Sequence, residues 1–117
     1  MKKIYHLSTC NTCQRIIKSL HDGEGFVLQD IKTEAITEAQ LEEMYQLAGS
    51  FEALFSRRAM KYRSLGLNEQ ELNEADYKKW ILEEYTFLKR PVILIDGEIF
   101  IGNAKKNVAA AQAKAGL

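Results

Sequence analysis

The only two cysteines of this chain, Cys10 and Cys13, stand three positions apart between a short apolar run at residues 4–7 and a helix-like stretch at residues 14–20. A thiol at such a strand-to-helix turn lies near the positive end of the helix dipole. That position stabilises the thiolate and lowers the thiol pKa from about 8.5 into the range of about 3.5 to 7.5. The spacing therefore predicts a β-α turn that carries one reactive thiolate, at Cys10.

Length and charge limit what surrounds this turn. A chain of 117 residues with 46% hydrophobic content is long enough for one core and too short for two, so we expect a single domain over residues 1–117. Sixteen basic and sixteen acidic residues cancel, which removes the basic field that drives nonspecific nucleic-acid binding. We therefore expect small ligands and proteins as partners, with no direct nucleic-acid contact.

The N-terminal residues predict a cytoplasmic protein. Polar residues follow closely after Lys2 and Lys3, so no signal-peptide apolar region forms, and no apolar run approaches the length of a membrane span. In a reducing compartment, a Cys-x-x-Cys beside a strand and a helix indicates redox or metal chemistry more often than a structural disulfide.

Turn residues and caps divide the first half of the chain. The expected elements are a strand at residues 3–7, a helix at 12–21, a turn at 22–25 and a strand at 26–30. Thr37 is expected to cap a longer helix with Gln40 as its capping-box partner, and Ser50 a short helix at residues 51–55. The apolar face of the longer helix, before Gly49, is expected to comprise Leu41, Met44, Tyr45, Leu47 and Ala48.

The second half predicts a helix, a hairpin and a last helix. Asn73 is expected to cap a helix that ends near Lys89 and Arg90, with Trp80, Tyr85 and Phe87 in the core. The remaining expected elements are a strand at residues 92–95 opened by Pro91, an Asp96-Gly97 turn into a strand at 98–101, and a helix capped by Asn103 that runs to about Lys114. The order β-α-β, helical block, β-β-α predicts an α/β, thioredoxin-like fold with a helical insertion between its halves.

Three motifs resemble one family. They are residues 4–6 leading to Cys10, the Leu-Gly-Leu at 65–67 after an arginine-bearing segment, and the Lys-Arg-Pro-Val at 89–92. With them the chain resembles, over nearly its whole length, the arsenate reductase family of thioredoxin-like fold, which also includes Spx-type and MgsR-like transcription regulators.

The resemblance implies roles for individual residues. It implies that the Cys10 thiolate attacks an oxyanion, which is bound by Arg90 and by an arginine after the short helix. Counting forward from the helix end selects Arg57, which we favour, whereas counting back from residues 65–67 selects Arg58, and both stay open. It also implies a cis peptide before Pro91, beside the reactive thiol. Thr12 adds a hydroxyl donor near Cys10.

Two departures from the family pattern bear on the substrate. Arsenate reductases carry a third substrate arginine beyond the hairpin, where this chain has residues 101–103, Ile-Gly-Asn. Family members often have arginine directly after the position of Cys13, where Gln14 stands here and Arg15 comes one place later. The departures weaken the case for arsenate itself and predict a differently shaped anion pocket.

The two thiols predict a redox cycle without a bound cofactor. Cys13 lies one helical turn beyond Cys10, so it can attack a Cys10 adduct and leave an internal disulfide. An external thiol, glutathione or a thioredoxin- or glutaredoxin-type protein, would resolve the adduct in its place or reset the disulfide.

Simpler roles stay open for the same residues. The two cysteines are alternatively buried apolar thiols, or half of a zinc site with His6 and His21, although these histidines lack the usual paired spacing and we expect no metal. His6 is better explained as a packed or hydrogen-bonded residue. Arg57 and Arg58 can form a solvated basic face, and Arg90 suits a helix C-terminus.

Two other functions compete with an arsenate reductase. One is a redox-switched regulator of the Spx type that binds RNA polymerase, because Gly49 matches a glycine that such regulators use for that contact. The other is a glutathione-dependent thiol reductase that acts on a different substrate.

Overall fold

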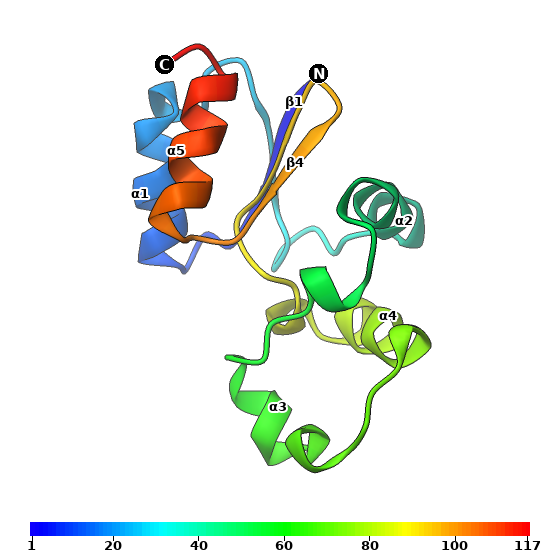
Figure 1. The fold of residues 1–117 in the computed structure, drawn as a ribbon. Coiled ribbons are helices and arrows are strands. Elements are labelled where there is room, and N and C mark those ends of the chain that lie inside the picture. The colour runs from blue at the N-terminus through cyan, green and yellow to red at the C-terminus, as the bar shows by residue number, and fades with distance from the viewer. The chain divides into compact units, whose positions relative to one another are not determined.

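The computed structural model describes all residues, 1–117, and divides into two compact units. The first unit comprises residues 1–35 and 90–117, and the second comprises residues 36–89. The second unit is therefore inserted between two halves of the first, as the helical insertion was predicted (Figure 1). The mixed α/β fold confirms the predicted class, and the single domain over residues 1–117 stays a prediction.

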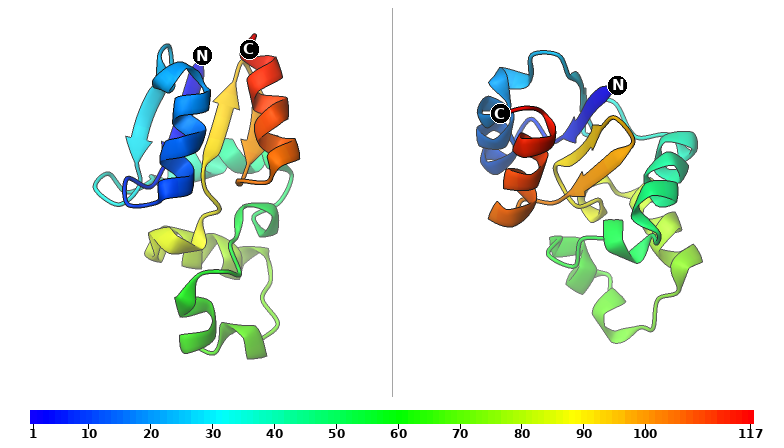
Figure 2. Two further views of the ribbon diagram at one scale, coloured as in Figure 1. Left: turned by 90° about the vertical axis from the view of Figure 1, so that its left-hand side faces the viewer. Right: turned by 45° about the horizontal axis from the view of Figure 1, so that its top comes forward.

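The first unit is a four-stranded sheet with two helices. Its strands run in the spatial order β2-β1-β3-β4, with β1 and β2 parallel and the other neighbours antiparallel. The elements are β1 (Lys2–His6), α1 (Asn11–Ser19), β2 (Val27–Asp30), β3 (Val92–Ile95), β4 (Glu98–Ile101) and α5 (Lys105–Lys114). Helices α1 and α5 lie side by side on one face of this sheet in every view (Figures 1 and 2).

One apolar cluster joins the two helices to the sheet. It comprises Ile4, Ile16, Ile17, Leu20, Ile93, Ile95, Phe100 and Ala111. Each fully buried aliphatic side chain of this size contributes about 1.5 to 3 kcal/mol through the hydrophobic effect. The cluster therefore packs the second half of α1 against β1, and the cysteine turn lies at the other end of this helix.

The β3–β4 hairpin forms as its sequence predicts. Asp96 and Gly97 both have positive φ, at 47° and 86°, which is the conformation of a type I′ turn. This turn matches the twist of the flanking strands and sets the register that places Val92 opposite Ile101.

The second unit is helical and has its own aromatic core. It contains α2 (Glu38–Ala48), α3 (Met60–Ser64) and α4 (Glu74–Glu83), with short 3-10 turns between them. Phe55 is fully buried and contacts the rings of Phe87, Tyr77 and Tyr62. The predicted capping box of Thr37 and Gln40 forms, with both hydrogen bonds at 3.0 Å. Phe87 is buried as expected, and Trp80 is half-buried against it.

Four sequence predictions about these elements are wrong. Leu47 is 39% exposed, so it does not belong to the buried face of α2. Helix α4 ends at Glu83 because the Glu84 carboxylate caps the next turn by accepting from the Thr86 N–H at 3.2 Å. Arg90 therefore does not stand at a helix C-terminus. Asn103 does not cap α5, whose N-cap residue is Ala104.

No helix of this chain has both the length and the apolar character needed to cross a membrane.

Candidate active site

The candidate site begins where β1 gives way to α1. Cys10 is the N-cap residue of α1, with extended backbone, and its N–H donates to the Leu7 carbonyl oxygen at 3.0 Å. The Cys10 carbonyl oxygen accepts the N–H of Gln14 at 3.1 Å, which closes the first turn of the helix. This geometry aims the first free N–H groups of α1 at the Cys10 side chain.

The pKa of Cys10 lies below its ordinary value. Partial burial raises the pKa of this thiol, but hydrogen bonds from the backbone and thiol of Cys13, the charge of Arg90 and the Thr12 N–H outweigh that effect. All of these groups stabilise the negative sulfur over the neutral thiol. Cys10 is also partly exposed, so a small molecule can reach it.

Cys13 has the opposite character. Its side chain is fully buried, and burial raises its pKa to about 12 even though a backbone hydrogen bond from Leu7 acts in the other direction. The neighbouring Cys10 sulfur raises the pKa of Cys13 further. The two thiols are both free in this structure. The pair thus combines one accessible thiol with a lowered pKa and one buried thiol with a raised pKa.

Gln14 fastens the turn to the end of β1. Its Nε2 donates to the Leu7 carbonyl oxygen at 3.1 Å and lies 3.3 Å from Nδ1 of His6. His6 is only 9% exposed, which confirms it as a packed, hydrogen-bonded residue. Gln14, which stands where family members often have arginine, therefore holds the cysteine turn to the end of β1 through its side-chain hydrogen bonds. No group of three or more His, Cys, Asp or Glu side chains is close enough together to hold a metal ion.

Arg90 and Pro91 lie in the same unit as the cysteines, directly before β3. The Arg90–Pro91 peptide bond is cis, as the resemblance implies. Arg90 is half-buried, and its positive charge lowers the pKa of Cys10. Gly102 donates its N–H to the Pro91 carbonyl oxygen at 2.9 Å, which ties this segment to the end of β4. The fold therefore holds a fixed cation within electrostatic reach of the thiolate.

Thr12 connects the thiolate to the surface of α1. Its backbone N–H interacts with the Cys10 sulfur, and its hydroxyl oxygen accepts a long hydrogen bond from Arg15 Nη2 at 3.4 Å. In the sequence, Arg15 stands out only as lying one place beyond the usual family arginine, and its contact with Thr12 comes from the exposed face of α1. The role of the Leu7 carbonyl oxygen could not be predicted either, because every residue type has a backbone carbonyl.

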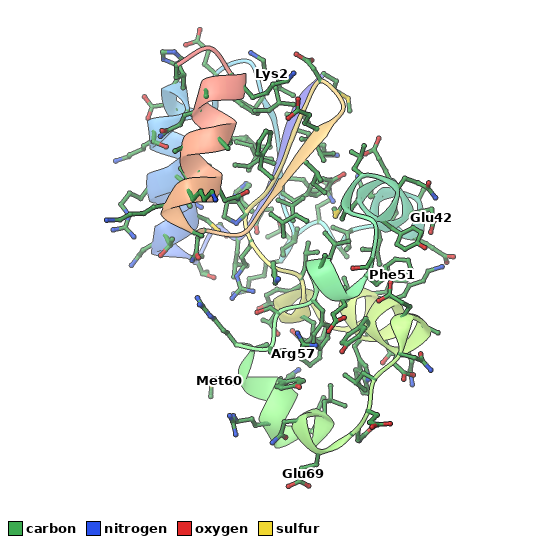
Figure 3. All side chains as sticks on the ribbon, in the orientation of Figure 1. Lys2, Glu42, Phe51, Arg57, Met60 and Glu69 are labelled. Atoms are coloured by element: carbon green, nitrogen blue, oxygen red, sulfur yellow. The ribbon has the colours of Figure 1, made fainter.

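Arg57 and Arg58 belong to the helical unit. Figure 3 labels Arg57, which lies on the segment before α3. Its Nη2 donates to Glu52 Oε2 at 2.6 Å and to the Tyr77 hydroxyl at 2.8 Å, and the bond to Glu52 raises the pKa of Arg57. Arg58 is exposed and takes part in no ion pair within that unit. The structure thus gathers Cys10, Cys13, Thr12, Arg90 and Pro91 in one unit. The part that either Arg57 or Arg58 takes at the site stays a prediction.

The arrangement of thiols, cis-proline and arginine invites comparison with known proteins. Residues 5–111 match the ArsC family. The chain belongs to the ArsC family. Global transcriptional regulator Spx 2 from Bacillus anthracis is 25% identical over 105 residues, which cover 87% of this chain and 79% of that protein.

Solved structures support the fold of this ArsC-family chain. The protein YffB superimposes with a TM-score of 0.80 at 22% identity, covering 96% of this chain and 99% of its own. An arsenate reductase from Vibrio cholerae gives a TM-score of 0.79 at 18% identity, covering 93% and 95%. The ArsC fold confirms the predicted thioredoxin-like architecture, and the family supports a thiol-dependent oxidoreductase.

The contrast between the two thiols predicts a pH-dependent alkylation pattern. Alkylation by iodoacetamide requires thiolate, so the rate at Cys10 should rise with pH and level off below the ordinary thiol pKa of about 8.5. Cys13, with a pKa of about 12, should stay protonated and protected throughout this range. We expect one adduct per native chain at neutral pH by mass spectrometry, and two after unfolding. Equal labelling of both thiols in the native state would contradict this assignment.

Proposed function

We propose that this chain is a thiol-dependent reductase of the arsenate reductase type, in which the Cys10 thiolate attacks a tetrahedral oxyanion such as arsenate. The observation that carries the proposal is the lowered pKa of an accessible Cys10, with the charge of Arg90 acting on its sulfur. A guanidinium group is always charged and fits tetrahedral oxyanions through paired N–H donors. The same groups that stabilise the thiolate would therefore also attract the anion it attacks.

The proposed first step forms a sulfur–arsenic bond. The Cys10 thiolate displaces one oxygen of arsenate, which leaves as hydroxide and takes up a proton to become water. In the second step, the sulfur of Cys13 attacks the sulfur of Cys10. The electron pair of the broken sulfur–arsenic bond stays on arsenic, which becomes arsenite, and the proton of Cys13 passes to an arsenite oxygen. Two thiols are thus oxidised to one disulfide, and arsenic is reduced by two electrons.

An external thiol completes the proposed cycle. A thioredoxin- or glutaredoxin-type dithiol would reduce the Cys10–Cys13 disulfide, or glutathione would replace Cys13 in the second step. The burial of Cys13 supports internal resolution, because a protected thiol is available only to its immediate neighbour. The test is arsenate-dependent NADPH consumption, coupled separately through glutathione with glutaredoxin and through thioredoxin. Absence of turnover with every reductant, in folded protein with reactive thiols, would refute the assignment.

Arginine substitutions in the helical unit should identify the second oxyanion contact. We expect Arg57→Gln to raise the KM for arsenate by about tenfold, because a charged hydrogen bond contributes about 1.5 to 3 kcal/mol. Arg58→Gln serves as the matched neighbour and should change KM by less than about twofold. Steady-state kinetics on both variants checks this. The reverse result would assign the contact to Arg58, and no change in either would remove both from the substrate site.

A second candidate is a redox-switched transcription regulator of the Spx type. The similarity to Spx 2 favours it, and so does the setting of Gly49. Gly49 ends α2 with φ of 87°, is exposed, and has no atom within 4 Å of where a Cβ would lie. A surface of this kind is open to a partner, although the same conformation also ends helices that bind nothing. Stable capture of the RNA polymerase α subunit, without arsenate turnover, would favour the regulator.

A further inference from the structure

The two helices that cover the sheet carry charge of one sign only. Helices α1 and α5 contain five basic residues and no acidic residue, although the whole chain has sixteen of each. The five are Arg15, Lys18, Lys105, Lys106 and Lys114. Only Lys114 forms an ion pair, with Glu98 at 3.1 Å. The helical layer is therefore a basic surface on a chain with no net charge.

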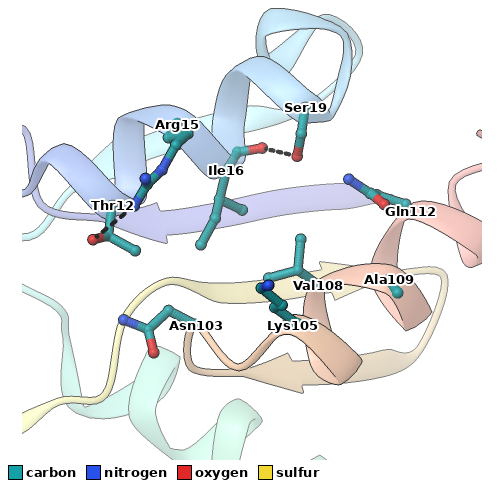
Figure 4. Close-up of a pocket in the computed structure, with 9 residues that line it drawn as sticks. All are labelled: Thr12, Arg15, Ile16, Ser19, Asn103, Lys105, Val108, Ala109 and Gln112. Atoms are coloured by element: carbon teal, nitrogen blue, oxygen red, sulfur yellow. Dashed lines mark hydrogen bonds between the residues drawn. The ribbon is translucent and has the colours of Figure 1, made fainter.

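A groove runs between these two helices (Figure 4). Its volume is about 460 Å³, and Ile16 and Val108 point toward each other across it. Arg15 from α1 and Lys105 from α5 stand on its opposite sides, and no carboxylate lines it. An apolar centre with a charged rim is the usual anatomy of a protein–protein contact. The charge of the rim selects an acidic partner.

The groove reaches the reactive thiol through Thr12. The side chain of Thr12 lines the groove, and its backbone N–H interacts with the Cys10 sulfur. A protein docked along the groove would therefore contact the turn that carries Cys10, although Cys10 itself does not line the groove. Cys13 is buried, so an incoming thiolate meets Cys10 first.

We propose that the groove between α1 and α5 docks an acidic dithiol protein of the thioredoxin type, which reduces the Cys10–Cys13 disulfide. This inference rests on the function proposed above and chooses an acidic protein over free glutathione as the reductant. An acidic side chain near the partner's exposed cysteine would meet Arg15 or Lys105, and an apolar side chain would enter between Ile16 and Val108.

The electron transfer takes two thiol–disulfide exchanges. The partner's first thiolate attacks the sulfur of Cys10, the Cys10–Cys13 bond breaks, and Cys13 leaves as a thiolate that takes up a proton. The partner's second thiol then loses its proton and attacks the partner's first sulfur in the mixed disulfide, and the Cys10 thiolate leaves. Two electrons pass to this chain, and the partner leaves as an internal disulfide. The docking surface acts on the first exchange, because that step brings the two proteins together.

A reduction assay on oxidised protein tests the docking surface. The Cys10–Cys13 disulfide is formed with a chemical oxidant, and its reduction is followed with an acidic thioredoxin, with glutathione and with dithiothreitol. The quantity measured is the thioredoxin rate constant divided by the dithiothreitol rate constant, which cancels effects on the disulfide itself. For Arg15→Glu with Lys105→Glu, we expect this ratio to fall at least about tenfold at low salt. In the wild type the ratio should also fall as salt is added.

Two comparisons guard this result. Lys32→Glu with Lys79→Glu makes the same change in net charge at exposed positions outside the groove, and should leave the ratio within about twofold of wild type. Arg15→Gln with Lys105→Gln removes the charges without reversing them and should give an intermediate ratio. This variant tests the docking surface if the charge-reversed variant folds poorly.

Three outcomes would overturn the docking proposal. They are an unchanged ratio in the groove variants, an equal fall in the control variant, and a fall with glutathione but not with thioredoxin. The third would mean that the groove serves a small anion. Because the disulfide is made chemically, a failure to reduce arsenate leaves this assay intact, so failure of the proposed function and failure of the docking surface are distinguishable.

Discussion

Replacing Cys10 with serine should abolish arsenate-dependent turnover, with a fall of roughly 10⁴-fold or more, because a hydroxyl has neither the acidity nor the nucleophilicity of this thiol. The substitution should leave the fold intact, since Cys10 is partly exposed and the turn is held by backbone bonds. Coupled NADPH consumption measures the loss, and circular dichroism checks the fold. Appreciable turnover in Cys10→Ser would show that another group attacks the substrate.

Cys13→Ser is the matched control at the other thiol. If Cys13 resolves the adduct, this variant should stall after the first step, and mass spectrometry should detect a Cys10 adduct in place of an internal disulfide. Rescue by added glutathione is expected, because an external thiol can take the same role. Full turnover in Cys13→Ser with thioredoxin alone would show that internal resolution is not used.

Arg90→Gln should lower kcat/KM for arsenate by about 10²-fold, the usual effect of removing one charged donor from a developing anion. The same change should raise the pKa of Cys10, because the charge of Arg90 now lowers it. The thiolate absorbance of the variant, titrated in the ultraviolet, should therefore appear at higher pH than in the wild type. Two independent readouts thus follow from one substitution.

Arg63→Gln makes the same chemical change at an exposed position on α3 and should move neither readout. A fall in kcat/KM for Arg90→Gln without a shift in the Cys10 pKa would assign Arg90 to substrate binding alone. A pKa shift without loss of turnover would contradict its role as an oxyanion contact.

Local signals predicted the parts of this fold that depend on near neighbours. The Thr37 capping box and the Asp96-Gly97 turn each involve residues within three positions, so the sequence states them directly. The end of α4 could not be predicted in this way. Tyr85 and Phe87 continue the apolar pattern, but the helix stops at Glu83, and the Glu84 carboxylate caps the 3-10 turn that follows.

Helix α3 could not be predicted for a different reason, which is that it has no buried face. It spans only five residues, Met60–Ser64, and none of them is buried, so no apolar periodicity marks it. Residues 105–114 did form the expected last helix, but Asn103 faces solvent while the Asn107 side chain donates to the Gly102 carbonyl at 2.9 Å. The sequence alone does not determine which backbone group a polar side chain near a helix start will hydrogen-bond.

The residues of the candidate site also differ in how far the sequence predicts them. Cys10, Cys13 and Arg90 lie beside recognisable turns and a proline, so the sequence marked them and the fold brings them into one unit. Arg57 and Arg58 are adjacent in a segment without regular structure, and counting from flanking motifs left a choice between them. The structure adds what counting could not, namely that Arg57 is already bound to Glu52 and Tyr77.

The Leu7 backbone is the most connected group at the cysteine turn, since its carbonyl accepts from Cys10 and Gln14 while its backbone also bonds the Cys13 sulfur. An alanine scan would shorten the Leu7 side chain and leave every one of these bonds in place. A comparison of related sequences would not detect these hydrogen bonds either, because any residue except proline supplies the same N–H and carbonyl. Side-chain substitutions therefore cannot test the backbone hydrogen bonds of Leu7. A change to the backbone itself, such as an amide-to-ester replacement, is needed to test them.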